Sequence, residues 1–390
     1  MANVSSSNSQ KALVPKLRFP GFEGEWKEST LGEIGTFTKG APLSKADISS
    51  QGTPFILYGE LYTTYDEVIE NVVRRTEKSA SSEQISRIGD VIIPTSGETP
   101  EEIATASCVM LPGVILAGDL NIFRTNTVDG RLISYIIRHV INKKISCVAQ
   151  GKSVVHVKAD ELSKISVRYP GSAEQHKLLS FLALLQSRIA VQRRLVEALK
   201  SYKRGVTKAI FNPNSVYQNC AESWRLRKVS ELLSYEQPQK YIVQTEHYSS
   251  NYATPVLTAN KGFILGYTNE TTGVYDKGDV VIYDDFTMDM KYVDFPFKVK
   301  SSTIKFLTAK PGNNLYFLFC LLQSLSLTPE GHQRSYISKV EQMNVFVPSV
   351  DEQSRIAGIL KKVTVILERH EFALHKLEML KAGLLNQLFI

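Results

Sequence analysis

The sequence lacks the features that would place it at once among membrane, secreted or metal-stabilised proteins. No apolar run reaches the roughly 18 residues that a membrane-spanning helix needs. The first ten residues are rich in Ser and Asn and have no apolar core, so we expect no secretory signal. The four cysteines (Cys108, Cys147, Cys220 and Cys320) form no CxxC pair. Zinc and disulfide frameworks are therefore not expected, and a reducing cytoplasm is the predicted location.

Motifs for nucleotide chemistry are incomplete. No G-x-G-x-x-G follows a strand-like segment, so nothing supports a Rossmann cofactor site. Gly151-Lys152-Ser153 ends like a P-loop, but Ser146 stands where that motif requires its first glycine. The seven histidines are scattered without the spacing of metal ligands. We therefore expect no metal and no cofactor on this chain.

Two further patterns leave an enzymatic alternative open. Asn212-Pro213-Asn214-Ser215 begins like the Asn-Pro-Pro-aromatic motif of adenine methyltransferases, but Ser215 has no ring to hold a flipped base. Asp279, Asp289 and Lys291 could mimic the acidic residues and lysine that hold a metal in nucleases. Such a trio is common on protein surfaces. A nuclease or a fused methyltransferase thus remains the weaker alternative.

The length and the charge distribution point to several domains. A chain of 390 residues is too long for a single compact core and predicts two or three domains. The formal charge is +7, and residues 172–222 alone carry 8 basic and 3 acidic residues, or +5. Most of the excess charge therefore lies in one short segment, which suits either DNA or an acidic partner surface.

Two long segments align at a constant offset of 178 residues, and both read as helices. One follows Tyr169-Pro170 and the other follows Val347-Pro348. Their apolar residues recur in alternating steps of four and three, which is typical of a coiled coil. The predicted seam comprises Leu178, Leu182, Leu185, Ile189, Gln192, Val196 and Leu199 in the first helix, and Ile356, Leu360, Val363, Leu367, His370, Leu374 and Leu377 in the second. The polar positions match as well, since Gln192 aligns with His370 and Lys203 with Lys381.

The repeat continues around these helices. Glu174-Gln175 matches Glu352-Gln353, and Ser172 with Gln175 predicts a capping box at the start of the first helix. The flanking segments are rich in Val, Ile, Thr, Tyr and Phe and predict β-rich domains. The expected organisation is an N-terminal segment (1–22), a first domain (23–171), a central helix with linker (172–222), a second domain (223–349) and a C-terminal helix (350–390).

Short motifs follow one another along the chain. They are Trp26 with Leu31-Gly32-Glu33, Gly89-Asp90-Val91-Ile92, Pro94-Thr95-Ser96-Gly97, Gly151-Lys152-Ser153 with His156, and Pro170 with Glu174-Gln175. Their order, repeated twice, resembles the specificity (S) subunits of type I restriction–modification systems, and the resemblance covers nearly the whole chain. The second half departs from the pattern, because Gly331-His332-Gln333-Arg334 replaces the Gly-Lys-Ser form and no Pro-Thr-Ser-Gly turn follows Ile282.

This resemblance implies an α+β fold with two target recognition domains separated by two long antiparallel coiled-coil helices, related by a pseudo-twofold repeat. It implies a non-catalytic, DNA-binding subunit that reads one half of a bipartite target with each domain. The expected partners are double-stranded DNA, two methyltransferase subunits and restriction (translocase) subunits. S-adenosylmethionine, ATP and Mg²⁺ are then expected on those partners. A coiled-coil assembly protein without a DNA role is the other alternative.

The candidate DNA contacts are loop residues of two kinds. Phosphates favour cations, hydroxyls and free backbone N–H groups. The candidates for this role are Ser96, Gly97, Lys152, Ser153, His156 and Lys158 in the first domain, and His332, Arg334, Ser335, Tyr336 and Lys339 in the second. Base edges favour amides, cations and acceptors. The candidates here are Glu60, Tyr62, Thr63 and Glu98 in the first domain, and Asn260, Lys261, Asp284, Asp285 and Lys291 in the second.

We expect the length of the long helices to set the distance between the two half-sites. The seam from Leu178 to Ile210 spans roughly 50 Å at 1.5 Å per residue. Two recognition domains related by a two-fold axis need half-sites about one helical turn of DNA apart, roughly 34 Å, and a helix of this length is compatible with that distance. We therefore expect that a four-residue insertion near Gln192 lengthens the recognised spacer.

Overall fold

The computed structural model describes residues 14–151, 154–212, 224–259, 262–325, 327–328 and 334–390. The chain forms two compact units, Met1–Val191 with Leu374–Ile390, and Gln192–Ala373. Each unit holds one globular domain and a part of each long helix, α7 (Ser172–Phe211) and α11 (Val350–Leu388). Among the described residues, none of the helices combines the length and the hydropathy that a bilayer span requires.

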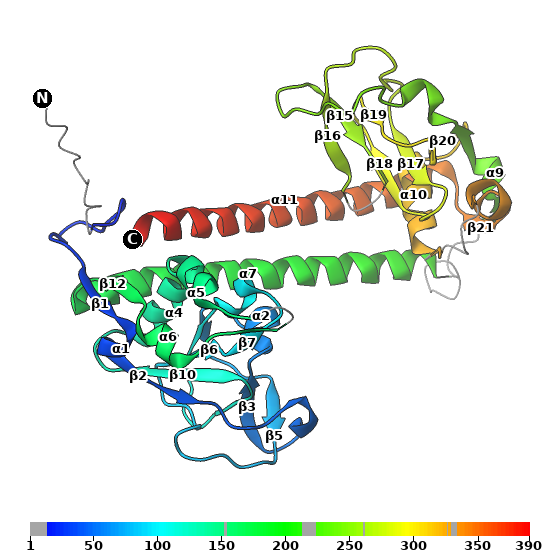
Figure 1. Ribbon diagram of the computed structural model, residues 1–390. Helices are drawn as coiled ribbons and strands as arrows, with labels where there is room; N and C mark the ends of the chain where they lie inside the picture. Colours follow the sequence, from blue (N-terminus) through cyan, green and yellow to red (C-terminus); the bar gives the residue numbers. More distant parts are fainter. Residues whose placement is uncertain (1–13, 152–153, 213–223, 260–261, 326, 329–333) are drawn as a thin grey trace, which may run out of the picture. The chain divides into compact units, whose positions relative to one another are not determined.

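The globular domain of the first unit is built on a five-stranded sheet and a three-stranded sheet (Figure 1). The five-stranded sheet has the order β2 (Gly35–Lys39), β10 (Leu120–Thr125), β6 (Asp90–Pro94), β8 (Ser107–Val109) and β4 (Val68–Ile69). The three-stranded sheet has the order β5 (Arg74–Thr76), β3 (Thr53–Leu57) and β9 (Ile115–Ala117), and two ribbons join β1 (Lys27–Thr30) to β12 (Ser166–Tyr169) and β7 (Ser96–Gly97) to β11 (Val155–His156). The helices are α1 (Leu31–Ile34), η1 (Lys45–Asp47), α2 (Glu60–Thr63), α3 (Pro100–Ile103), α4 (Gly130–His139), α5 (Asn142–Val148) and α6 (Ala159–Ser163).

The globular domain of the second unit has a four-stranded and a three-stranded sheet. The four-stranded sheet has the order β14 (Leu233–Glu236), β20 (Ile304–Ala309), β17 (Val280–Asp284) and β18 (Met290–Val293). The three-stranded sheet has the order β16 (Ile264–Thr268), β15 (Thr254–Leu257) and β19 (Lys298–Val299), and a ribbon joins β13 (Arg225–Lys228) to β21 (Asn344–Val347). The helical elements are α9 (Val229–Leu232), η2 (Pro238–Tyr241), α10 (Leu315–Ser324) and a short π-helix, η3 (Tyr336–Val340).

The topology of the two domains confirms the internal repeat. In the first domain β3 is antiparallel to β5 and parallel to β9, and in the second β15 is antiparallel to β16 and parallel to β19. The central strands β6 and β17 are buried along their whole length, as expected for apolar runs that pack on both faces. The predicted α+β fold with repeated β-rich domains is therefore confirmed.

The two long helices bury the predicted seam and continue it into the domain cores. The buried seam residues are Leu178, Leu182, Ile189, Val196, Ile356, Leu360 and Leu367, and the half-buried ones are Leu185, Gln192, Leu199, Val363, His370, Leu374 and Leu377. In the first unit, Leu178 and Leu182 share a core with Leu385 and Leu388, so the start of α7 lies beside the end of α11. The helices are therefore antiparallel. At 40 and 39 residues they are about 60 Å long.

The start of α7 corrects the predicted capping box. Ser172 is already the first helical residue, and Gln175 directs its carboxamide elsewhere. Its Nε2 donates to the carbonyl of Pro170 (3.0 Å), and its Oε1 accepts from the N–H of Asp129 (2.9 Å). Asp129 caps α4, so the glutamine joins the long helix to a helix of the domain. Because a carboxamide can both donate and accept, Gln175 satisfies two backbone groups at once in this buried position.

Gln353 makes the same two bonds in the second unit. Its Nε2 donates to Pro348 O (3.0 Å), and its Oε1 accepts from the N–H of Asn314 (2.9 Å), the cap of α10. Both glutamines are almost completely buried, with 6% and 2% of their surface exposed. The matching glutamines of the repeat therefore fix each domain on the first turn of its long helix.

Candidate nucleic-acid interface

The ribbon of β7 and β11 brings together candidate residues that lie about 60 positions apart in the sequence. His156 pairs with Ser96, and Val155 pairs with Gly97. The Ser96 hydroxyl donates to Asp119 Oδ2 (2.7 Å), and the Tyr62 hydroxyl donates to the Ser96 carbonyl (2.9 Å). Burial raises the pKa of Tyr62, with smaller effects from nearby acids, so the phenol stays protonated and remains a donor. Four segments that are distant in the sequence therefore meet at one edge of the first domain.

Two adjoining recesses extend from this edge. One is lined by Lys45, Glu60, Thr63 and Arg74, and the other by Lys39, Asn121, His156 and Lys158. Both share the wall formed by Leu43, Ser44, Gly118 and Asp119. Cations, hydroxyls and an amide side chain thus line one continuous surface, which has the donor set that phosphates and base edges require.

Glu60 has a supporting position in this surface. Only 4% of it is exposed, and its carboxylate accepts from Leu57 N (3.0 Å) and from Arg74 Nε (2.7 Å). With both oxygens engaged, this carboxylate is held inside the fold, while 41% of the Arg74 side chain is exposed. Sequence reasoning missed Arg74, because its partner lies 14 residues away and no local motif marks the pair.

The other predicted residues of the first domain differ in exposure. Thr63, Glu98, His156 and Lys158 are exposed, whereas Ser96 and Gly97 are buried in the ribbon. The Thr63 hydroxyl donates to Gly59 O (3.3 Å), and the N–H of Glu98 donates to Glu102 (3.0 Å). The predicted residues that lie outside the described part of the chain are Lys152, Ser153, Asn260, Lys261 and His332.

In the second domain the predicted acids are structural. Asp284 Oδ1 accepts from the N–H groups of Phe286 (2.9 Å) and Thr287 (3.0 Å), and its Oδ2 accepts from the Thr303 hydroxyl (2.7 Å). The carboxylate therefore caps the turn that follows β17.

Asp285 lies inside the second domain, with 1% of its surface exposed. It forms an ion pair with the equally buried Lys305 (2.9 Å). Its Oδ1 also accepts from the N–H of Tyr336 (3.0 Å), and its carbonyl accepts from the Ser335 hydroxyl (2.7 Å). A buried pair with such additional bonds holds the 335–336 segment in place.

The remaining candidates of the second domain divide by exposure. Tyr336 is fully buried against Tyr235 and Tyr283. Arg334 is exposed, whereas Lys291 and Lys339 are half-buried. The structure thus brings a set of accessible polar groups together in the first domain, and leaves three dispersed cations as the accessible candidates of the second.

The acidic residues that suggested a nuclease do not form a metal-binding set. Asp279 accepts a hydrogen bond from the Tyr292 hydroxyl. Among the described residues, no three His, Cys, Asp or Glu side chains lie close enough to hold a metal ion together.

The sequence matches the family described as the type I restriction modification DNA specificity domain, over residues 23–201 and again over 221–378. The chain belongs to this family. The two matched ranges follow the internal repeat, so each half of the chain carries one specificity domain.

Individual relatives agree with this assignment. The chain is 42% identical over 147 residues to the EcoR124I/EcoR124II specificity subunit of Escherichia coli, a match that spans 36% of the chain and only 36% of that relative. The crystal structure of the type I restriction–modification S subunit from M. genitalium has a TM-score of 0.71 at 14% identity, covering 97% of this chain and 99% of that one. A chain from a study of type I system assembly and conformational transition has a TM-score of 0.52 at 18% identity, with coverages of 96% and 99%. At these identities the similarities show the fold alone.

Proposed function

We propose that this chain is the DNA specificity subunit of a type I restriction–modification complex. Each specificity domain reads one half of a bipartite duplex target, and the chain itself performs no chemistry. Adenine methylation and ATP-dependent cleavage belong to partner subunits, which bind S-adenosylmethionine, ATP and Mg²⁺. The complex acts on DNA in the cytoplasm.

The observation that carries this proposal is the duplication. The family domain occurs twice, and each copy has a three-stranded sheet with the same strand directions and the same buried glutamine on its long helix. Two copies of one reader with different loops suit a target made of two different half-sites. In the first domain, the surface around Asp119, His156 and Lys158 supplies the polar groups for such reading.

The long helices provide surfaces for the partner subunits. In the first unit, Leu184 is 73% exposed and Leu380 52% exposed, and in the second unit Tyr202 is 60% exposed and Phe372 59% exposed. Tyr202 and Leu380 occupy equivalent positions of the repeat. Exposed apolar side chains of this size on a helix favour docking of another protein. We propose that each unit docks one methyltransferase subunit, and that restriction subunits join this assembly.

Selection from random duplexes tests the proposal. The purified complex with its methyltransferase subunits is incubated with a pool of random double-stranded DNA, and the bound fraction is sequenced. Enrichment of two short fixed sequences separated by an unspecified spacer is expected. Absence of any enrichment would contradict a reading function and favour a coiled-coil assembly protein.

A further inference from the structure

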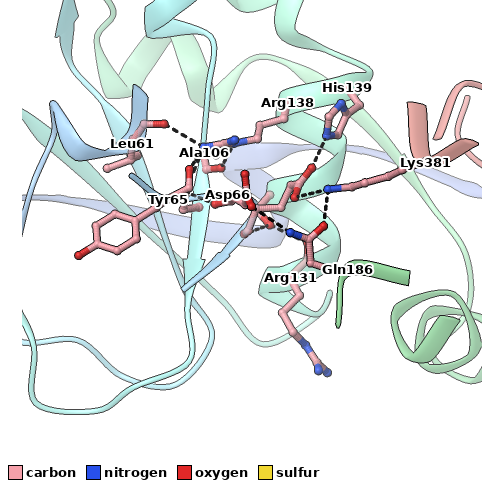
Figure 2. A network of polar contacts seen from close by, with 12 residues as sticks. Leu61, Tyr65, Asp66, Ala106, Arg131, Arg138, His139, Gln186 and Lys381 are labelled. Atoms are coloured by element: carbon pink, nitrogen blue, oxygen red, sulfur yellow. Dashed lines mark hydrogen bonds and ion pairs between the residues drawn. The ribbon is translucent and has the colours of Figure 1, made fainter. Parts of the chain in front are cut away.

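Glu67 is a buried carboxylate that joins the first domain to a long helix. It directly precedes β4, and 4% of its surface is exposed. Its Oε2 accepts from Lys381 Nζ of α11 (2.8 Å), and its Oε1 accepts from His139 Nε2 of α4 (2.7 Å) (Figure 2). An ionised carboxylate can only accept, so Nε2 of His139 carries a proton.

A second long helix closes these contacts into a ring. Lys381 Nζ also donates to Gln186 Oε1 of α7 (2.8 Å), and Gln186 Nε2 donates to Asp66 Oδ2 (2.9 Å). Asp66 and Glu67 are neighbours in the sequence. Both long helices therefore hold the same dipeptide of the first domain, and Figure 2 shows Gln186 and Lys381 beside Asp66.

The ring continues to the loop that carries candidate base-reading residues. Arg138, next to His139 on α4, donates to the carbonyls of Leu61 (3.0 Å) and Tyr65 (2.9 Å). These carbonyls lie within and just beyond α2 (Glu60–Thr63), which contains Tyr62 and Thr63. We call residues 60–65 the reading loop. Arg138 bonds to this loop, its neighbour His139 bonds to Glu67, and Glu67 bonds to Lys381 of α11. The reading loop is thus connected to a long helix.

The Glu67 backbone ties the same parts together. Its carbonyl accepts from the Ser134 hydroxyl of α4 (2.7 Å) and from the N–H of Cys108 (2.8 Å). Glu67 is buried and bonded to Lys381 and His139, and Lys381 is bonded in turn to Gln186. This set specifies one geometry, since any displacement leaves the buried carboxylate without a partner.

In the second unit, the residues equivalent to Gln186 and Lys381 are in part of a different type. By the 178-residue offset, Gln186 corresponds to Thr364 and Lys381 to Lys203. Thr364 Oγ1 accepts a neutral hydrogen bond from the Tyr316 hydroxyl of α10 (3.0 Å). The charged ring is thus specific to the first unit within the described part of the chain.

We propose that Glu67, Lys381 and Gln186 are positioning residues for the reading loop of the first domain. They hold α2 against both long helices, so selectivity for one half-site depends on residues remote from the DNA-facing surface. This inference rests on the proposed DNA-reading function.

The test compares Glu67→Gln and Lys381→Met with two controls in the full complex. Lys381→Arg keeps a cationic donor, and Lys203→Met removes the equivalent lysine of the second unit. Methylation mapping is expected to show lower sequence selectivity at the same half-site in both test variants. Discrimination against single mismatches there should fall by about tenfold, which lies within the free-energy penalty of one mismatched base pair. The other half-site keeps its selectivity, and both controls behave as the wild type. Unchanged selectivity in both test variants, or equal relaxation of both half-sites, would overturn the inference.

A second measurement does not depend on DNA. Thr64 and Tyr65 directly follow α2, and their N–H groups donate to the carbonyl of Glu60, the first residue of that helix. Their hydrogen exchange is expected to rise by about tenfold or more in both test variants, because the loop loses its support. Unchanged exchange would contradict the positioning role. A wild-type complex that yields no bipartite motif would instead refute the proposed function, so the two failures are distinguishable.

Discussion

Gln192 on α7 contacts His370 on α11, the residue that occupies its own position in the other half of the repeat. Gln192 Nε2 lies 2.8 Å from the His370 carbonyl and 3.0 Å from His370 Nδ1. In an antiparallel pair, repeat-related residues meet only where the local two-fold axis between the helices crosses them. Within the second unit, this contact therefore joins two residues that are equivalent in the repeat.

The Gln192–His370 pair is expected to fix the register at some cost in stability, as buried polar residues do in coiled coils. We predict that the double variant Gln192→Leu, His370→Leu raises the free energy of unfolding by roughly 1–2 kcal/mol, because two apolar side chains replace polar ones in the seam. The midpoint of denaturant unfolding measures this change. The methylated motif of this variant should tolerate more than one spacer length. A single sharp spacer would show that register is set elsewhere.

Lengthening the helices is expected to lengthen the spacer. Because Gln192 and His370 are paired in antiparallel helices, four residues should be inserted after Gln192 and four before His370. Both helices then gain about 6 Å and the seam remains in register. We predict a spacer longer by about two base pairs at 3.4 Å each. Methylation mapping reads this directly. The same spacer length in wild type and variant would show that helix length does not set the spacer.

The buried glutamines are expected to act each within its own unit. Replacing Gln175 or Gln353 by Leu leaves a carbonyl and an N–H buried without a partner, at a cost of about 1–3 kcal/mol for each group. We predict faster hydrogen exchange at the start of α4 in Gln175→Leu and at the start of α10 in Gln353→Leu. The exposed Gln387→Leu serves as the control. Equal effects on both domains from either variant would contradict this local role.

Stability in acid should depend on Glu67. Burial alone would raise the pKa of Glu67, but the bond from His139 and the charge of Lys381 outweigh it and lower the pKa from 4.5 to about 2. A depressed pKa stabilises the folded state above pH 4.5, and this contribution is lost as the pH falls towards 2. Its size is roughly 3 kcal/mol.

We therefore predict that wild type exceeds Glu67→Gln in unfolding free energy at neutral pH, and that the difference shrinks between about pH 4.5 and 2. Denaturant unfolding at a series of pH values measures it. Glu83→Gln, at an exposed position, is the matched control and should leave the curve unchanged. A difference that stays constant with pH would contradict the charge pairing.

Lys158 is expected to contact a phosphate. Replacing it by Ala should weaken DNA binding about equally for all sequences and reduce the slope of log affinity against log salt by about 0.9. Lys164→Ala is the control, since Lys164 is exposed in the same domain and pairs with Glu161 (2.9 Å). Titrations at several salt concentrations measure both slopes. An unchanged slope for Lys158→Ala would place the DNA elsewhere.

The repeat and the helices could be predicted because their signals are local and periodic. Steps of four and three identify the seam, and the 178-residue offset alone aligns Gln192 with His370. The function of Gln175 could not be predicted in the same way. Its partner Asp129 is 46 residues away, and only the fold brings the two together.

The candidate site was predictable only in part, for the same reason. The sequence marks the segments around Ser96 and His156 as polar and Gly-led, and the structure pairs them. Asp285 looked equally suitable in the sequence, but Lys305 neutralises it in the interior. Whether an acidic residue faces solvent depends on which cation the strands place beside it, and that information is absent from a single sequence.

Genome-wide methylation mapping in a host that expresses this chain with its methyltransferase subunits tests the central claim most directly. The predicted result is one bipartite motif, with two fixed half-sites, a spacer of constant length and methylated adenines. A continuous motif, or a methylation pattern that does not change when the chain is expressed, would contradict the account.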